Sequence, residues 1–111
     1  MNKEVKALFS LQDKVAAVIG GARHLGRDLA EALAEAGADV AITSRDASRA
    51  EETARSLSQA TGRKILPLAL DATDEAAVRF CFSKIGEHFG RLDILVNNAG
   101  GTVYRRRLSL C

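Results

Sequence analysis

Residues 15–26 read Val-Ala-Ala-Val-Ile-Gly-Gly-Ala-Arg-His-Leu-Gly: an apolar run, a glycine-rich turn and the start of an amphipathic segment. The apolar run predicts a strand buried on both faces, and the amphipathic segment predicts a helix. A strand that turns sharply into a helix directs backbone N–H groups and the positive end of the helix dipole toward one point. Glycine suits this turn because a ligand must approach the backbone where a Cβ would intrude. The stretch therefore predicts a site for a phosphate or pyrophosphate.

The rest of the chain alternates between apolar runs and segments with helical periodicity. In chain order, the expected elements are strand 15–19, helix 24–36, strand 40–43, helix 47–59, strand 64–70, helix 74–89 and strand 92–96. Alternation of this kind predicts a parallel sheet with right-handed crossover connections. Pro67 predicts an edge position for the third strand, because proline has no N–H to donate to a neighbouring strand.

The third expected helix has the clearest amphipathic pattern. Its apolar positions recur at spacings of four, three and four residues: Val78, Phe82, Ile85 and Phe89. One face of this helix is therefore expected to pack on the sheet. Thr73 is expected to cap its N-terminus, and Gly90 is expected to end it.

Length and composition are those of one small globular domain. Of the 111 residues, 47% are hydrophobic and 27% are charged, which suits a single core. The net charge is +2, and the arginines at 105–107 supply three positive charges, so the body of the chain has no basic face for nucleic acid.

Apolar runs fall far short of the roughly 20 residues of a membrane span. Residues 1–14 lack the apolar core of a signal peptide. Cys81 and Cys111 show neither metal-site nor disulfide spacing, which predicts a cytoplasmic protein without a metal site.

Three sequence motifs, and the spacing between them, resemble the N-terminal part of the short-chain dehydrogenase/reductase family. The Thr-Gly-x-x-x-Gly-x-Gly turn of the family corresponds to residues 19–26, its acidic element after the third strand to residues 71–74, and its Asn-Asn-Ala-Gly element to residues 97–100. The resemblance implies an α/β partial Rossmann fold over residues 1–111. Its parallel sheet would have about four strands in the order 3-2-1-4, with helices on both faces. The resemblance covers about residues 9–104, and residues 105–111 match no element of the family. Residues 101–111 are expected to form an irregular tail.

The resemblance also implies a nicotinamide dinucleotide cofactor. The residues that it assigns to the cofactor site are Gly20, Gly21, Ala22, Arg23, His24, Leu25, Gly26, Ser44, Arg45, Asp71, Ala72, Asn98, Ala99 and Gly100. Asp71 would contact the adenine amino group beside the backbone of Ala72, although an acid at the start of a helix is the simpler alternative. Asn98 and the two residues after it would line the ribose near the nicotinamide. Asn97 would brace the neighbouring strand, although a turn that ends the strand remains the alternative for this tetrapeptide.

Two residues in the turn depart from the family pattern. Ile19 replaces the usual threonine and so lacks its hydroxyl, and His24 replaces the middle glycine. If this second position requires a positive φ, histidine is strained there. His24 either donates to the pyrophosphate or is a tolerated surface substitution.

The end of the second strand predicts NADP(H) rather than NAD(H). Ser44 stands where the family pattern places an acid that binds the ribose 2′-OH, and Arg45 follows it. An arginine at this place suits a 2′-phosphate, and Arg23 is a second basic residue within reach. The alternatives are that both arginines are merely solvated and that Asp46 serves the ribose of NAD.

The catalytic pair of the family is a Tyr-x-x-x-Lys, and residues 1–111 contain none. Tyr104 is the only tyrosine, and Leu108 stands four residues after it. We therefore predict no catalytic residues and no substrate pocket. The chain is expected to be the cofactor-binding part of an oxidoreductase that transfers hydride between a nicotinamide and a carbonyl or alcohol, and to be inactive alone. The alternatives are a non-catalytic nucleotide-binding module and a truncated product without function.

The order 3-2-1-4 leaves the fourth expected strand, residues 92–96, as an uncovered apolar edge. Such an edge favours self-association. The sequence therefore predicts a marginal, aggregation-prone monomer unless a partner completes the sheet. Full-length members of the family are expected to be homo-oligomers.

Overall fold

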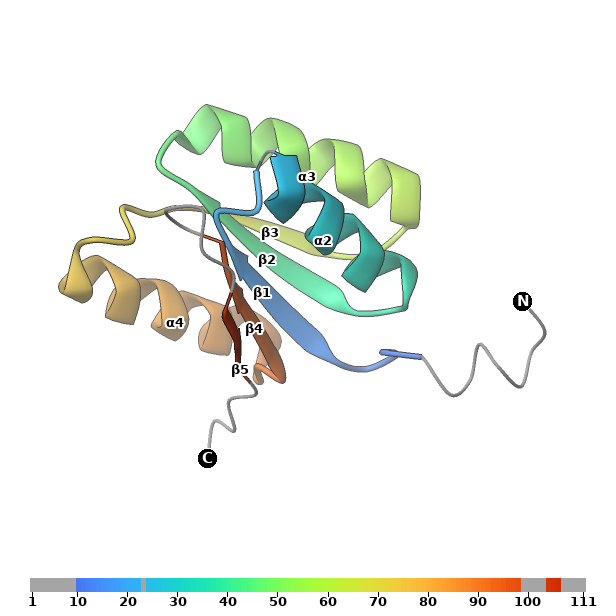
Figure 1. Ribbon diagram of the computed structural model, residues 1–111. Helices are drawn as coiled ribbons and strands as arrows, with labels where there is room; N and C mark the ends of the chain where they lie inside the picture. The colour runs from blue at the N-terminus through green and yellow to red at the C-terminus, as the bar shows by residue number, and fades with distance from the viewer. Residues whose placement is uncertain (1–9, 23, 99–103, 107–111) are drawn as a thin grey trace.

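A computed structural model describes residues 10–22, 24–98 and 104–106 as one sheet with helices on both faces (Figure 1). In chain order the elements are β1 (Val15–Ile19), α2 (His24–Glu35), β2 (Asp39–Ser44), α3 (Ala47–Thr61), β3 (Ile65–Ala69), α4 (Glu75–Phe89), β4 (Ile94–Asn97) and β5 (Tyr104–Arg106). The predicted alternation of strands and helices is confirmed. The predicted bounds differ from the observed ones by no more than two residues at either end.

The sheet has the strand order β3-β2-β1-β4-β5. The first four strands are parallel, which confirms the predicted order 3-2-1-4. Ala17 at the centre of the sheet lies opposite Ala41 on one side and Leu95 on the other. Pro67 lies opposite Ile42 in β3, which is an edge strand as predicted. Its missing N–H therefore costs no interstrand hydrogen bond on the open side.

The fifth strand corrects two predictions. Residues 101–111 were expected to be irregular, but Tyr104–Arg106 pairs antiparallel with β4, with Asn97 opposite Tyr104 and Leu95 opposite Arg106. The outer edge of β4 is therefore not left uncovered, contrary to the prediction for residues 92–96. Unpaired N–H and C=O groups on a strand edge are a template for any backbone that reaches them. Such pairing needs no apolar pattern, so the sequence carried no signal for it. The remaining tail residues lie outside the described part of the chain.

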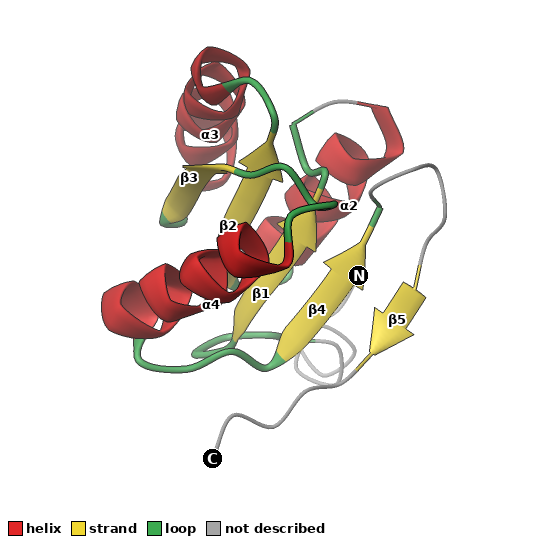
Figure 2. Cartoon of the chain, turned by 90° about the vertical axis from the view of Figure 1, so that its left-hand side faces the viewer, coloured by secondary structure: helices red, strands yellow, loops and turns green. Residues whose placement is uncertain are grey.

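Two apolar layers flank the sheet, one on each face (Figure 2). Helices α2 and α3 cover one face, and α4 covers the other, which confirms the prediction of helices on both faces. The buried core under α2 and α3 comprises Ala16, Val18, Ala30, Ala34, Ala38, Val40, Ile42, Ala54, Leu57 and Val96. The buried core under α4 comprises Val15, Ala17, Ile19, Ala41, Leu70, Cys81, Ile85 and Leu92. Alternate residues of β1 point to opposite faces, which is why its whole sequence is apolar.

The N-terminus of α4 is capped one residue later than predicted. The carboxylate of Asp74 accepts the N–H of Ala77 at 3.2 Å, so Asp74 and not Thr73 is the cap. The hydroxyl of Thr73 is engaged elsewhere, since it donates to Asp71 at 2.6 Å. Gly90 ends the helix in the left-handed conformation, with φ +78°, as predicted.

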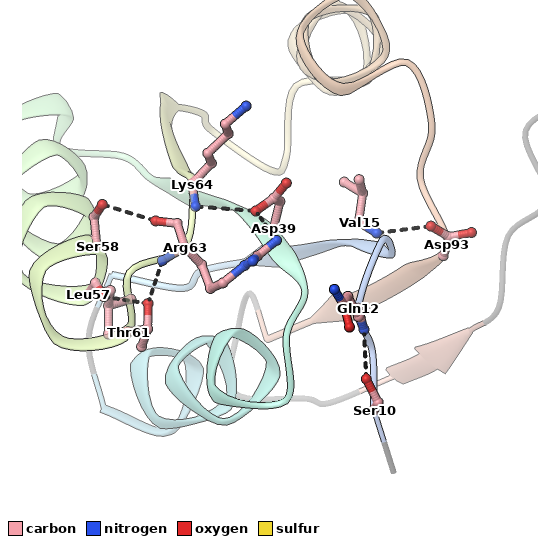
Figure 3. Close-up of polar contacts among 10 residues, drawn as sticks. All are labelled: Ser10, Gln12, Val15, Asp39, Leu57, Ser58, Thr61, Arg63, Lys64 and Asp93. Carbon is pink, nitrogen blue, oxygen red and sulfur yellow. Dashed lines mark hydrogen bonds and ion pairs between the residues drawn. The ribbon is translucent and has the colours of Figure 1, made fainter. Parts of the chain in front are cut away.

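Two carboxylates tie the amino ends of the strands together, at the edge opposite the glycine-rich turn. Figure 3 shows Asp93 accepting the N–H of Val15 at 2.9 Å and Asp39 accepting the N–H of Lys64 at 3.2 Å. Asp93 also accepts two hydrogen bonds from Arg91, at 2.7 and 2.8 Å. These contacts hold the first residue of β1 next to Asp93, the residue that precedes β4.

We expect the free energy of unfolding of Asp93→Asn to fall less at acid pH than that of the unmodified chain. Hydrogen bonds from Arg91, and to a smaller extent the N–H of Val15, hold the pKa of Asp93 below its usual value. A carboxylate with a lowered folded-state pKa contributes stability above its unfolded pKa of about 3.9, and this stability is lost as pH falls through the folded-state value. Urea unfolding should show Asp93→Asn less stable by about 1 kcal/mol at pH 7.

The same titration between about pH 5 and pH 2 should show a smaller loss of stability in Asp93→Asn than in the unmodified chain. Asp28→Asn, on the exposed face of α2, is the matched control. Equal acid slopes for Asp93→Asn and the unmodified chain would show that the Asp93 carboxylate adds no stability.

Candidate functional site

The carboxyl ends of the four parallel strands lie at one edge of the sheet (Figure 2). From β1 the chain crosses through α2 on one face, and from β3 it crosses through α4 on the other face to reach β4. The strand order therefore reverses between β1 and β4. In open parallel sheets, ligands bind in the crevice outside the carboxyl ends of the strands at such a reversal. The glycine-rich turn lies there.

The turn packs against the first turn of α2 with no room for a side chain. A Cβ on Gly26 would collide with the carbonyl oxygen of Gly20 and would lie 2.8 Å from Nδ2 of Asn98. A Cβ on Gly21 would lie 2.9 Å from Cγ2 of Ile42. Gly20 has a φ of +79°, which glycine adopts at no steric cost. These glycines therefore form a cradle of bare backbone at the crevice.

His24 adopts the left-handed backbone conformation, with φ +53°. Most residues other than glycine pay about 1–2 kcal/mol for this conformation. The expectation that histidine is strained where the family has glycine is therefore confirmed. Its side chain is exposed, and so is that of Leu25, at 53%. Donation from His24 to a pyrophosphate stays a prediction, and Arg23 lies outside the described residues.

Two threonines that sequence reasoning missed hold the turn. The N–H of Gly20 donates to Oγ1 of Thr43, and the N–H of Gly21 donates to the carbonyl oxygen of Thr43, both at 3.0 Å. Oγ1 of Thr53 donates to the carbonyl oxygen of Ala22 at 2.8 Å. Two amides of the turn are thus already satisfied within the protein. The signal in the sequence was a hydroxyl within an otherwise apolar strand and another within an apolar helix stripe.

The N-terminus of α2 points its backbone N–H groups toward the same edge. Its first turn contains no acidic residue, so no carboxylate of this turn neutralises the positive end of the helix dipole. The first four N–H groups of a helix have no partner within the helix. The arrangement suits an anion.

Arg45 and Asp46 follow the end of β2 and have different surroundings. Oδ1 of Asp46 accepts the N–H groups of Ser48 at 2.9 Å and Arg49 at 3.3 Å, so Asp46 caps α3. Oγ of Ser44 accepts the N–H of Asp46 at 3.1 Å. Arg45, between them, is exposed. The Asp46 carboxylate is therefore engaged with the helix, whereas the Arg45 side chain is 76% exposed.

The loop after β3 brings together two residues that were predicted separately. Oδ1 of Asp71 accepts the hydroxyl of Thr73 at 2.6 Å and its N–H at 2.9 Å. The Nη2 atom of Arg45 lies 3.9 Å from the same oxygen. The hydrogen bonds from Thr73, and to a smaller extent Arg45, lower the pKa of Asp71. Asp71 is not the cap of α4, and Ala72 packs beside the core under that helix.

The end of β4 meets the end of β1. The N–H of Asn98 donates to the carbonyl oxygen of Ile19 at 2.8 Å. Its side-chain nitrogen would lie 2.8 Å from a Cβ placed on Gly26. Asn97 lies opposite Ile19 in the parallel ladder. Asn98 is therefore within the crevice, whereas Ala99 and Gly100 lie outside the described residues.

A family model for short chain dehydrogenases matches residues 14–110. The chain belongs to the short-chain dehydrogenase family. This short-chain dehydrogenase chain is 44% identical over 103 residues to an uncharacterized oxidoreductase of Mycobacterium tuberculosis, covering 92% of this chain and 38% of that protein.

Two solved structures are similar to this short-chain dehydrogenase chain. One is the Pseudomonas aeruginosa protein RhlG in an active-site complex with NADP, with a TM-score of 0.77, 43% identity and coverage of 83% of this chain and 36% of RhlG. The other is L-sorbose reductase of Gluconobacter frateurii with NADPH and L-sorbose, with a TM-score of 0.80, 35% identity and coverage of 83% and 35%. The chain thus spans little more than a third of each relative.

The described part of this short-chain dehydrogenase chain contains neither a candidate metal site nor a candidate membrane span. No three or more His, Cys, Asp and Glu side chains in it are grouped so that they could hold a metal ion. No described helix combines the length and apolarity that crossing a membrane requires.

Proposed function

We propose that this chain binds NADP(H) as the cofactor-binding part of a short-chain dehydrogenase-like oxidoreductase. The observation that carries the proposal is the cradle at Gly26, where Gly20 and Asn98 leave room for backbone alone. A turn so bare, beside a helix N-terminus without acidic residues, fits a pyrophosphate. The complexes of the two similar structures with NADP and NADPH support the choice of ligand.

The residues at the strand ends fit the remaining parts of the cofactor. The turn and the start of α2 would hold the pyrophosphate, and Asp71 would accept from the adenine amino group. Asn98, with Ala99 and Gly100 after it, would line the ribose near the nicotinamide. Arg45 would pair with the 2′-phosphate of NADP. Asp46 is a weaker candidate for the ribose of NAD, because its carboxylate caps α3.

The nicotinamide, when bound, supplies or accepts the hydride exchanged with a carbonyl or alcohol. The described residues bind and orient the cofactor. A positioned general acid contributes typically 10²–10⁴-fold to such a reaction, and the family's Tyr-x-x-x-Lys does not occur in residues 1–111. We therefore infer that the chain alone binds cofactor without turnover. A cytoplasmic location and homo-oligomeric full-length relatives stay predictions.

Titration of the purified chain with NADPH tests the proposal. Fluorescence of the nicotinamide should rise saturably with added protein, and no carbonyl reduction should accompany it. Binding without turnover fits both the oxidoreductase part and the alternative of a nucleotide-binding module, and a Tyr-x-x-x-Lys encoded downstream would distinguish the first. No saturable binding at millimolar NADPH would overturn the proposal and favour a product without function.

We expect Arg45→Ala to weaken NADPH binding about tenfold and to leave NADH binding within twofold. A hydrogen bond between charged groups contributes about 1.5–3 kcal/mol, and exposure of Arg45 favours the lower value. Fluorescence titration with both cofactors gives the ratio. Arg55→Ala, an exposed arginine on α3, is the matched control and should change neither affinity. An equal loss for both cofactors would show that Arg45 does not contact the 2′-phosphate.

A further inference from the structure

Both buried polar side chains of the described core bond to the glycine-rich turn, one at Gly20 and the other at Ala22. Thr43 and Thr53 are the polar residues found buried there, with exposures of 1% and 8%. Oγ1 of Thr43 accepts the N–H of Gly20, its backbone carbonyl oxygen accepts the N–H of Gly21, and Oγ1 of Thr53 donates to the carbonyl oxygen of Ala22. The two threonines lie 23 and 31 residues away along the chain from their side-chain partners. The glycine-rich turn is therefore held from β2 and from α3 at once.

Burying two threonine hydroxyls costs free energy, and an apolar side chain would pack in the same space without that cost. A buried hydroxyl is unfavourable unless it is hydrogen-bonded, and valine would fill nearly the same volume without that condition. Glycines adopt many backbone conformations, so a turn rich in glycine loses more entropy on ordering than other segments. Hydrogen bonds from two separate elements select one of these conformations before any ligand arrives.

The bonds also decide which amides remain for a ligand. The N–H groups of Gly20 and Gly21 are bonded to Thr43 and so are not available to a ligand. The N–H groups of the first turn of α2, by contrast, have no partner within the helix. The anion-binding donors are therefore those that follow the turn, and their direction depends on how the turn is held.

We propose that Thr43 and Thr53 are positioning residues, which set the glycine-rich turn so that the amides at the start of α2 face the pyrophosphate of the dinucleotide. This inference rests on the proposed function. Neither threonine touches the cofactor. Each acts through the backbone of residues 20–22.

The variants Thr43→Val and Thr53→Val test the inference with two ligands. NADPH contains the pyrophosphate, whereas adenosine 2′-monophosphate carries the adenine and the 2′-phosphate without it. Each valine variant should weaken NADPH binding about five- to tenfold, the effect of one misdirected hydrogen bond or slightly more. Each should leave binding of adenosine 2′-monophosphate within twofold. Thr43→Ser and Thr53→Ser, which keep the hydroxyl, should restore NADPH binding.

Thr61→Val is the matched control. Oγ1 of Thr61 donates to the carbonyl oxygen of Leu57 at 2.7 Å and accepts the N–H of Arg63 at 3.3 Å, at the C-terminal end of α3. Loss of this hydroxyl removes hydrogen bonds of the same kind far from the turn and should change neither affinity. Calorimetric titration of both ligands, with circular dichroism of each variant, provides the measurements. An equal loss for both ligands would mean that the threonines only stabilise the fold, and this would overturn the inference.

Two further results separate the inference from the proposed function. If the unmodified chain does not bind NADPH, the proposed function fails, and the positioning role fails with it. If the chain binds NADPH and the valine variants bind equally well, only the positioning role fails.

Hydrogen exchange on the unmodified chain tests the same role without a variant. The Gly20 and Gly21 amides should be protected from exchange in the free chain and should stay protected with NADPH. Loss of this protection on binding would mean that they turn to the ligand, contrary to the inference.

Discussion

Gly26→Ala should destabilise the chain by about 3 kcal/mol, although alanine is normally the better helix residue by about 1 kcal/mol. The added Cβ would collide with the carbonyl oxygen of Gly20 and would press on Nδ2 of Asn98. The Gly20 oxygen is backbone, and the turn that carries it is tied to Thr43. It cannot move aside as a flexible side chain would. The steric cost therefore exceeds the gain in helix propensity. The added Cβ pushes the glycine-rich turn away from the first turn of α2.

Gly86→Ala is the matched control, because Gly86 also lies within a helix, α4. A Cβ at this position would meet no heavy atom within 4 Å. The same substitution should therefore stabilise the chain there by about 0.5–1 kcal/mol, through helix propensity alone. Urea unfolding followed by circular dichroism gives both values. Two changes of the same sign would show that the contact at Gly26 is not what excludes a side chain.

Ile85→Ala should destabilise the chain by about 2–5 kcal/mol and should release α4 before the rest of the sheet unfolds. Ile85 is fully buried at the centre of the face that α4 presents to the sheet, in a core with Ala17, Ala41 and Leu92. Truncation leaves a cavity that the helix can fill only by moving. Because α4 is the only described helix on this face (Figure 1), its docking depends on few buried side chains.

Phe80→Ala is the control for this experiment, since Phe80 lies on the same helix and is 64% exposed. It removes more atoms than Ile85→Ala, together with the contact of Lys84 Nζ 5.1 Å from the centroid of the Phe80 ring. It should nevertheless change stability by no more than about 1 kcal/mol. Urea unfolding measures the total effect. Hydrogen exchange should show lost protection in α4 and retained protection in β1 and β2 for Ile85→Ala. Uniform loss of protection throughout would show that α4 unfolds only with the whole sheet.

Most of the fold could be predicted because its signals are local. The continuous apolar run of β1, the helical spacing of Val78 to Phe89 and the proline in β3 each depend on a few neighbouring residues. The cap of α4 was predicted one residue early, because Thr73 and Asp74 are both good capping residues. Only the bond from Thr73 to Asp71 excludes the threonine.

The sequence by itself determined the order of strands and helices, the place of the glycine-rich turn and the positions that must be glycine or apolar. It did so because periodicity and backbone freedom are properties of short segments. Only the tertiary structure decided that Thr43 and Thr53 hold the turn, that Asp71 lies beside Arg45, and that β5 pairs with β4. These contacts join groups distant in sequence, and a hydrogen bond depends on where both partners lie in space, which no local pattern specifies.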